Sequence, residues 1–409
     1  MTDISGKAAR ALTILIRFLT PVCILYFLDT AQLGWFYLIN SVIAFSSFAL
    51  SFESGYYFSC KANRRPHAAG VSRYLAWIGV SQALFSVTLA FPLIFVFLLI
   101  SNLFSVPLFC ALMLYSYSEV VANEFGRFLG NTNQVRWLVL RDLWRAISLL
   151  AAALVAIWLF KSISLPFFFV LLCFFNCCLI GVEHVLGGSA PPRPRIGHLL
   201  RLRLLRKLPL QIIYTSKGVI LQSWLMYLYP IAERLIIGKT IGVSAVGKYG
   251  FIVALFQSVL TIFFLPDITR MRSAVISHLG RAAAPEKIAG LKALLVRTVL
   301  FALLMAAGTI AASAINERFG ILSDFQVSIA SVLAAMIFVV SNNFIYIVSP
   351  HFSRPPYTTA TTIMTSTIHL CSLSLCYAAF YFLGIRSEIL FVILSLGFVT
   401  QLIARKQYL

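Results

Sequence analysis

The stretch YLAWIGVSQALFSVTLAFPLIFVFLL (74–99) decides the fold class, because no charged side chain interrupts it. A helix rises about 1.5 Å per residue and the hydrocarbon of a bilayer is about 30 Å thick, so about 20 apolar residues cross it. The composition of the whole chain agrees. Of its 409 residues, 60% are hydrophobic and 11% are charged, whereas a soluble domain carries about 25% charged residues. The sequence therefore predicts an all-α polytopic membrane protein.

Further stretches of this kind bring the expected number of transmembrane helices to about twelve. The fifth of them begins close to charged residues, and the first follows a polar N-terminus without a signal-peptide cleavage site, so we expect a helix there and not a removed leader. The twelve spans are predicted near residues 11–28, 34–54, 74–99, 103–125, 143–160, 164–182, 212–233, 248–267, 294–314, 326–348, 358–383 and 388–404.

The basic residues predict the orientation of these spans. The net charge of +20 would suggest nucleic acid in a soluble chain, but here the lysines and arginines lie in short segments between apolar runs. Twenty-six of the 33 fall in the two termini and the even-numbered loops, and five fall in the odd-numbered loops. Because cytoplasmic segments carry the excess of Lys and Arg, both termini are predicted to be cytoplasmic and no nucleic-acid partner is expected.

A polar segment near the middle of the chain divides the twelve spans into six and six. It covers residues 183–211, so the predicted domains are an N-terminal half (1–182), this cytoplasmic basic linker and a C-terminal half (212–409). The linker includes HLLRLRLLRK (198–207), which is either an ordinary cytoplasmic connection or a segment that lies against anionic lipid.

The two halves share a weak internal repeat. The segments AQLGWFYLINSVIAFSSFALSFES (31–54) and SAVGKYGFIVALFQSVLTIFFLPD (244–267) align without a gap at an offset of 213 residues, which places Gly34 on Gly247 and Phe36 on Tyr249. Each segment would be the second helix of a six-helix half, entered from the outer side. Six spans preserve orientation, so the halves are predicted to be parallel repeats around a central cavity, a recurrent plan of transporters.

The run AERLIIGKTIGVSAVGKYGFIVALFQSVLTIFFLPDITRMRSA (232–274) resembles the mid-chain signature of the O-antigen and polysaccharide flippases (Wzx type) of the multidrug/oligosaccharidyl-lipid/polysaccharide exporter superfamily. The segment 33–65 is similar to the first-half counterpart of that signature. The matching elements are an acidic residue near the end of the seventh span, a turn with Gly and Tyr, and a Pro before a basic loop: Glu233, Val246-Gly247-Lys248-Tyr249 with Ala254, and Pro266 before Arg270 and Arg272.

This resemblance implies a function. It implies a flippase that moves an undecaprenyl-diphosphate-linked oligosaccharide, the repeat unit of O-antigen or an exopolysaccharide, from the cytoplasmic to the periplasmic leaflet. The expected location is the cell inner membrane, as a multi-pass protein. The expected partners are the lipid-linked oligosaccharide, membrane lipids, and a glycan polymerase or other polysaccharide-assembly proteins.

Arginines inside the spans are the candidate substrate ligands. Each charge there costs at least about 2.5 kcal/mol on insertion scales, which makes it a functional-site hypothesis. Arg17 lies inside the first span, where its guanidinium could bind a diphosphate or could extend to the cytoplasmic headgroups. Arg234 lies near the outer end of the seventh span and is the second candidate for the anionic substrate.

Acidic residues and one histidine are the candidates for coupling and gating. Glu233 adjoins Arg234, but adjacent residues project about 100° apart on a helix and do not naturally pair. Glu119 has no basic partner in its own span, whereas the nearby Glu124 can pair locally with Arg127. The remaining candidates are Glu53 and Asp267, at equivalent inner ends of the second and eighth spans, and His369, either a proton relay or a packing histidine.

No catalytic or metal-binding constellation is recognisable in the sequence. The complete P-loop motif GxxxxGK[ST] is absent, as are HExxH and GxSxG, and the eight cysteines have no paired CxxC spacing, so neither an enzyme, a metal site nor a cofactor is expected. Two alternatives to the flippase remain. A membrane glycan polymerase or ligase would normally carry a large outer loop, and a multidrug exporter of the same superfamily often transports cations, which Arg17 and Arg234 would repel.

Overall fold

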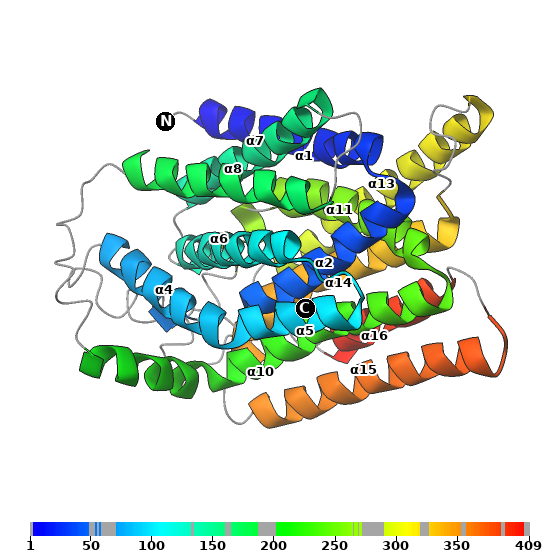
Figure 1. The fold of residues 1–409 in the computed structure, drawn as a ribbon. Coiled ribbons are helices and arrows are strands. Elements are labelled where there is room, and N and C mark those ends of the chain that lie inside the picture. The colour runs from blue at the N-terminus through cyan, green and yellow to red at the C-terminus, as the bar shows by residue number, and fades with distance from the viewer. Residues whose placement is uncertain are drawn as a thin grey trace. The chain divides into compact units, whose positions relative to one another are not determined.

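The three-dimensional structure is a computed structural model, and it consists of α-helices and connections throughout the part of the chain that it describes (Figure 1). It describes residues 3–48, 54, 57–58, 71–131, 135–159, 165–186, 202–264, 266–268, 270–271, 290–319, 327–352, 357–385 and 389–404.

In the part of the chain that the structure describes, a helix overlaps every one of the twelve predicted spans, which confirms the all-helical multi-span fold. In chain order the helices are α1 (Asp3–Phe27), α2 (Thr30–Phe48), α4 (Val71–Phe85), the π-helix η1 (Ser86–Ala90), α5 (Phe91–Ile100), α6 (Val106–Asn131), α7 (Val135–Leu159), α8 (Leu165–Leu186), α10 (Leu202–Thr240), α11 (Val243–Phe263), α13 (Leu291–Phe319), α14 (Ile329–Phe352), α15 (Tyr357–Tyr381) and α16 (Ile389–Ala404).

The third span is built from three consecutive helical pieces. Helix α4 passes into η1 and then into α5, which contains Pro92 in its first turn. A proline lacks the backbone N–H that an α-helix interior uses, and a π-helical turn is one way to accommodate the change in hydrogen bonding. The span therefore stays helical over its whole length, although its hydrogen-bond pattern changes in the middle.

The helix boundaries differ from the expected span boundaries where charged residues are involved. Helix α7 begins at Val135, so Arg141 and Arg145, which the charge count assigns to a cytoplasmic loop, lie inside a helix. Helix α10 has 39 residues, and residues 202–211 of the predicted linker form its first part, while residues 183–186 belong to α8. A hydropathy scan places the end of a span at the first charged residues. The backbone hydrogen bonds of the helix continue past these residues, so the helix is longer than the apolar run.

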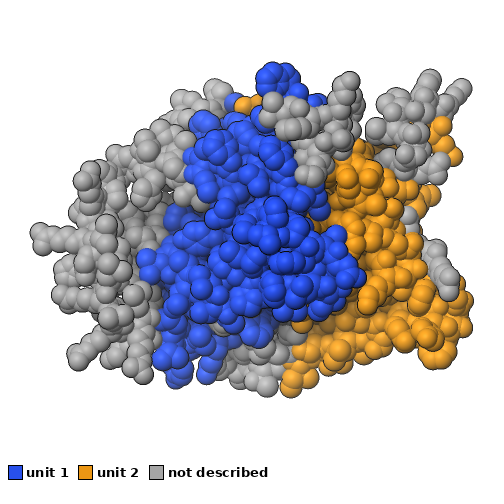
Figure 2. Space-filling model, in the orientation of Figure 1, with its two compact units in different colours: residues 1–9, 42–227 blue, residues 10–41, 228–409 orange. Residues whose placement is uncertain are grey.

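The chain divides into two compact units whose boundaries differ from the predicted domains (Figure 2). Unit 1 comprises Met1–Ala9 and Val42–Tyr227, and unit 2 comprises Arg10–Ser41 and Leu228–Leu409. Most of α1 and the first part of α2 thus belong to the same unit as the C-terminal helices. The division into 1–182, 183–211 and 212–409 stays a prediction of the sequence repeat.

Each unit has its own core of helix contacts. In unit 1, α6 packs against α8, and α7 packs against α8 and α6. In unit 2, α14 lies at the centre, in contact with α11, α13 and α16, while α15 packs on α16. Fully buried aromatic and aliphatic side chains fill both cores, among them Phe168 and Phe169 in unit 1 and Tyr249, Phe256 and Phe391 in unit 2.

Six of the described helices contain a segment that is long and apolar enough to cross a membrane, and two further helices carry shorter apolar segments. The six segments also expose many large apolar side chains, such as Ile100, Leu304 and Leu370, on the surface of the protein. In water such a surface would be unfavourable, whereas lipid solvates it. The structure is therefore that of a multi-pass membrane protein.

Candidate functional site

A buried carboxylate in α10 is the first feature of unit 2 that calls for a functional explanation. Glu233 is 1% exposed, and its Oε1 has no hydrogen-bond partner among the described residues. The hydroxyl of Tyr249, from α11, is likewise buried without a hydrogen-bond partner in the described part of the chain, and it lies close to Glu233. Burial of a carboxylate oxygen without a hydrogen-bond partner is costly, so this carboxylate is a candidate for binding a proton or a cation.

Tyr229 lies one helical turn before Glu233 and ties α10 to two other helices. Its ring stacks on that of His369, from α15, with centroids 4.1 Å apart and planes inclined by 14°. Its hydroxyl donates a hydrogen bond of 2.7 Å to the carbonyl oxygen of Leu394, in α16. His369 is 5% exposed, so the structure gives it a packing contact; its role as a proton relay stays a prediction.

Arg234 binds the backbone of α2. Its Nη1 donates a hydrogen bond of 3.0 Å to the carbonyl oxygen of Tyr37 and a second one to Oγ of Ser41. Ser41 itself donates to the Tyr37 carbonyl oxygen at 2.8 Å. The Nε atom of Arg234 is buried and has no hydrogen-bond partner within the described residues. Arg234 thus holds α2 and still has an unused donor, which is compatible with its predicted contact to an anionic substrate.

Arg17 lies on the protein-facing side of α1. Thr13 and Thr20 are buried one turn before and one turn after it, whereas Leu15 and Leu19 are exposed on the other side of the helix. The Arg17 side chain is half-buried and takes part in an interaction within the protein. This position favours the interpretation that Arg17 faces the protein interior over the one in which it extends along lipid.

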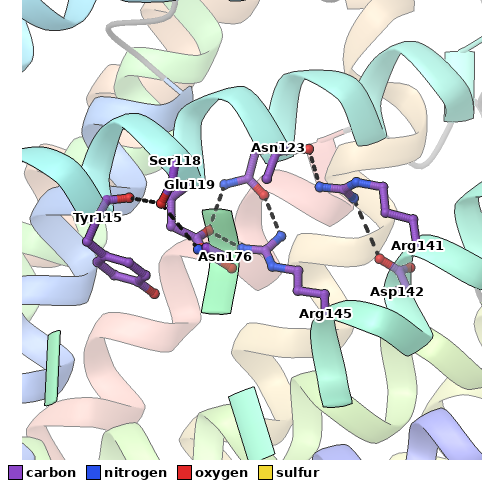
Figure 3. Close-up of polar contacts among 9 residues, drawn as sticks. Tyr115, Ser118, Glu119, Asn123, Arg141, Asp142, Arg145 and Asn176 are labelled. Atoms are coloured by element: carbon purple, nitrogen blue, oxygen red, sulfur yellow. Dashed lines mark hydrogen bonds and ion pairs between the residues drawn. The ribbon is translucent and has the colours of Figure 1, made fainter. Parts of the chain in front are cut away.

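A second polar cluster lies in unit 1, around Glu119 of α6 (Figure 3). Arg145 of α7 forms an ion pair with Glu119 through Nη2, and its Nη1 donates to Oδ1 of Asn123 at 2.8 Å. Asn176 of α8 donates to the other carboxylate oxygen of Glu119 at 2.8 Å, and Asn123 donates to Oε2 at 3.4 Å. Three helices therefore supply partners for one buried carboxylate.

Arg141 strengthens the same junction of α6 and α7 one turn earlier. It donates through Nη2 to the carbonyl oxygen of Ala122 and lies 3.7 Å from the carboxylate of Asp142. Gly126 makes room for it, since a Cβ atom at that position would collide with the Arg141 guanidinium. Arg141 and Arg145 thus both bind α6, which explains why these charged residues are tolerated inside α7.

A cavity of about 90 Å³ adjoins the Glu119–Arg145 ion pair. Its lining includes Tyr115, Ser148, Leu172 and Asn176 as well as the ion pair itself. A space of this size with several polar groups can hold ordered water. Sequence reasoning identified Glu119 as a candidate but missed Arg145 and Asn176, because only the packing of α6 against α7 and α8 brings them together.

The remaining predicted site residues have different outcomes. Asp267 forms a local ion pair of 3.1 Å with Arg270, and both side chains are exposed, so its gating role stays a prediction. Glu53 lies outside the described residues.

Glu124 is fully buried and accepts a hydrogen bond of 3.2 Å from Ser54; its expected partner, Arg127, has no described side chain. Within the described chain, no group of three potential metal ligands occurs.

Comparison with solved structures finds the same fold in a known transporter. The chain aligns with the crystal structure of the eukaryotic MATE transporter AtDTX14 with a TM-score of 0.55, over 98% of this chain and 90% of that chain, at 11% sequence identity. No family model and no curated protein matches the sequence. The fold is therefore that of a MATE transporter, and the similarity at this identity concerns the fold alone.

Proposed function

We propose that this protein is a flippase that moves an undecaprenyl-diphosphate-linked oligosaccharide from the cytoplasmic to the periplasmic leaflet of the inner membrane by alternating access. The substrate is an O-antigen or exopolysaccharide repeat unit, as the resemblance of residues 232–274 implies. Two facts support the general part of this proposal: the fold is similar to that of a transporter, and six of the described helices contain a segment that is long and apolar enough to cross a membrane.

The observation that carries the choice of substrate is the position of Arg17. It lies on the protein-facing side of α1, between two buried threonines, and belongs to the same compact unit as Arg234. A guanidinium binds phosphate oxygens bidentately and keeps its charge at any physiological pH. An arginine on the transport path thus favours an anionic lipid diphosphate over a cationic drug.

Glu233 is the residue that we assign to energy coupling. Its buried carboxylate, with the Tyr249 hydroxyl close by, can take up a proton or a monovalent cation and lose it when the site opens to water. Coupling of this kind needs no nucleotide. An anionic substrate can also be driven outward by the membrane potential, which contributes about 2.3 kcal/mol per charge at 100 mV.

Multidrug export is the second candidate function, and one observation favours it. The solved structure that shares the fold is called a MATE transporter, and it aligns over 98% of this chain. A drug exporter with this sequence would transport neutral or anionic compounds, because Arg17 and Arg234 repel cations. Loss of resistance to a drug panel on gene deletion, with unchanged glycan lipids, is the result that selects this candidate.

The test of the proposed function is a leaflet assay in the host. The gene is deleted, and glycosidase access to lipid-linked oligosaccharide is measured in vesicles of known sidedness. We expect the oligosaccharide to accumulate on the cytoplasmic face and to return to the periplasmic face when the gene is restored. Unpolymerised repeat units on the periplasmic face would instead identify a polymerase, which belongs downstream of a flippase.

A further inference from the structure

The first part of α10 extends beyond the membrane span that the sequence predicts for it. The predicted span is 212–233, whereas the helix begins at Leu202, in the segment that the charge count assigns to the cytoplasm. At about 1.5 Å per residue, this additional part is about 15 Å long. Residues 184–232 contain seven Lys or Arg and no Asp or Glu, so this stretch is purely basic.

One side of this part of α10 contacts the protein, and the opposite side is exposed. Ile212 is fully buried, and Gln211 accepts a hydrogen bond of 3.3 Å from the hydroxyl of Tyr57. Leu210 and Tyr214, on the other side of the helix, are 67% and 77% exposed. All five residues belong to unit 1, so both sides are described within one compact body.

The exposed side of α10 continues in both directions along the helix. Residues three, four or seven positions apart share one face of a helix, and such steps define a row that we call the outer stripe of α10. Arg203 and Lys207 belong to the row by their register, and the residues after them are exposed. The outer stripe consists of Arg203, Lys207, Leu210, Tyr214, Lys217, Trp224 and Leu228.

The chemistry of the outer stripe changes along the helix. Its start is basic, whereas its end lies inside the predicted span and is apolar, with Trp224 and Leu228 at 38% and 52% exposure. Lys217 stands between these parts, and its Nζ lies 5.3 Å from the centroid of the Tyr214 ring, one turn closer to the start of the helix. The ammonium group is thus directed toward the cytoplasmic end, as that of a lysine near the membrane surface is expected to be.

A lipid with an anionic headgroup matches both parts of the outer stripe. Anionic headgroups of the cytoplasmic leaflet attract Lys and Arg at the membrane surface, and acyl chains solvate apolar side chains below it. A water-soluble acidic protein could contact the basic part, but it would not reach Trp224 and Leu228 in the hydrocarbon. The stripe also lies on the surface of the protein, which suits a lipid that stays in its leaflet better than a substrate that is carried through the interior.

We propose that the outer stripe of α10 binds an anionic phospholipid of the cytoplasmic leaflet, with the phosphate near Lys217 and the basic start of the stripe and an acyl chain along Trp224 and Leu228. The same helix carries Glu233 and Arg234, so the bound lipid stabilises the helix that contains the proposed coupling residue. The binding of this lipid does not depend on the proposed transport of an oligosaccharide.

The test measures lipid selection by the full-length protein in vesicles. In a variant that keeps Trp224 as its only tryptophan, brominated phosphatidylglycerol and brominated phosphatidylcholine are compared as quenchers of tryptophan fluorescence. We expect phosphatidylglycerol to be preferred, and we expect Lys217→Gln to reduce the preference about fivefold through the loss of one basic charge at the membrane surface. Arg203→Gln/Lys207→Gln should reduce it further.

The matched control is Lys292→Gln, which removes an exposed lysine at the predicted cytoplasmic start of α13 and should leave the preference unchanged. Equal quenching by the two lipids, or equal effects of Lys217→Gln and Lys292→Gln, would contradict the proposal. If the single-tryptophan variant does not fold, native mass spectrometry of the wild-type and Lys217→Gln proteins with the two unlabelled lipids makes the same comparison.

Two competitors distinguish the phospholipid from other occupants of the outer stripe. Soluble glycerol phosphate should not displace phosphatidylglycerol, and full displacement would identify a site for a free anion or an acidic protein surface. Stronger binding of undecaprenyl diphosphate than of phosphatidylglycerol would assign the stripe to the transported lipid, and either result would overturn the proposal. Because no transport is measured, these outcomes are independent of the leaflet assay that tests the flippase function.

Discussion

Single charged residues inside the membrane find their partners on neighbouring helices. Glu119 is bound by Arg145 from α7 and by Asn176 from α8, so the three helices share one polar junction. Arg234 is bound to α2 in a comparable way, through a carbonyl oxygen and a hydroxyl. Glu233 differs from Glu119, because one of its buried oxygens has no hydrogen-bond partner among the described residues. That difference is the reason for assigning coupling to Glu233 and structure to Glu119.

Replacement of Arg145 tests the structural role of the unit 1 cluster. Arg145→Ala leaves Glu119 buried and without its cation, which typically costs about 3–5 kcal/mol when a buried ion pair loses one partner. We expect a clearly lower apparent midpoint of thermal unfolding in detergent. The double variant Glu119→Gln/Arg145→Gln removes both charges and should recover part of the loss.

The matched control is the exposed ion pair of Asp267 and Arg270, whose side chains are 39% and 72% exposed. Exposed pairs contribute about 0–1 kcal/mol, so Arg270→Ala should leave the midpoint almost unchanged. Equal effects of Arg145→Ala and Arg270→Ala would contradict the importance of the buried cluster.

Arg17 carries the clearest prediction about activity. Arg17→Ala should abolish flipping, whereas Arg17→Lys should retain part of it, because lysine supplies the charge but not the bidentate geometry. The measurement is complementation of the deleted gene at matched protein levels in the membrane. Full activity of the Arg17→Ala variant would show that Arg17 is not part of the transport path.

Part of the candidate site could be predicted from the sequence. The cost of charges in a membrane identified Arg17, Glu119, Glu233 and Arg234 without any structure. Their partners could not be found in this way, because a partner on another helix is determined by packing. Arg145 is the clearest case: its charge suggested a loop, and the structure places it in α7, opposite Glu119.

At the scale of helices, α2 and α11 approach each other closely at Gly34 and Gly247, and this crossing can be tested for its contribution to stability. Gly34→Ala or Gly247→Ala adds a methyl group where a neighbouring carbonyl oxygen already lies, and overpacking of this kind costs about 1–3 kcal/mol. We expect each variant to unfold at a lower temperature than the wild-type protein and to transport more slowly.

Two other helical glycines provide the comparison. A Cβ atom at Gly79 in α4, or at Gly308 in α13, would meet nothing within 4 Å. Alanine is favoured over glycine in a helix by about 1 kcal/mol, so Gly79→Ala and Gly308→Ala should be neutral or slightly stabilising. A drop in the unfolding midpoint for these variants equal to that of Gly34→Ala would mean that the crossing is not specially close-packed.

The positions and order of the membrane spans could be predicted, but the ends of the helices could not. A described helix overlaps each of the twelve predicted spans, because long apolar runs have no other way to satisfy their backbone hydrogen bonds in lipid. The predicted span at 212–233 lies within α10, whose 39 residues correspond to about 58 Å at about 1.5 Å per residue. This length exceeds the thickness of the hydrocarbon. The polar residues at both ends of the predicted span are therefore also helical, which a hydropathy scan cannot detect.

At the scale of the whole molecule, the charge count predicts which ends of the helices lie outside. Leu383, after α15, is 72% exposed and is expected on the outer side, whereas Lys292, at the start of α13, is exposed and expected in the cytoplasm. A membrane-impermeant maleimide should label Leu383→Cys in intact cells and Lys292→Cys only after lysis. Labelling of Lys292→Cys in intact cells would contradict the orientation.

The division into compact units could not be foreseen from the linker. Composition changes most at residues 183–211, but residues 10–41 belong to the unit that contains the C-terminal helices. The close contacts of Gly34 and Tyr37 with α11, and the bonds from Arg234, supply the physical reason. The internal repeat identified the segments 31–54 and 244–267 as related in sequence, but it did not predict that they contact each other.

Glycosidase access to lipid-linked oligosaccharide in sided vesicles tests the central claim most directly. With the gene deleted, we expect the oligosaccharide to stay on the cytoplasmic face, and we expect the wild-type gene, but not the Arg17→Ala variant, to return it to the periplasmic face. An unchanged distribution between the two faces after deletion would contradict the flippase function.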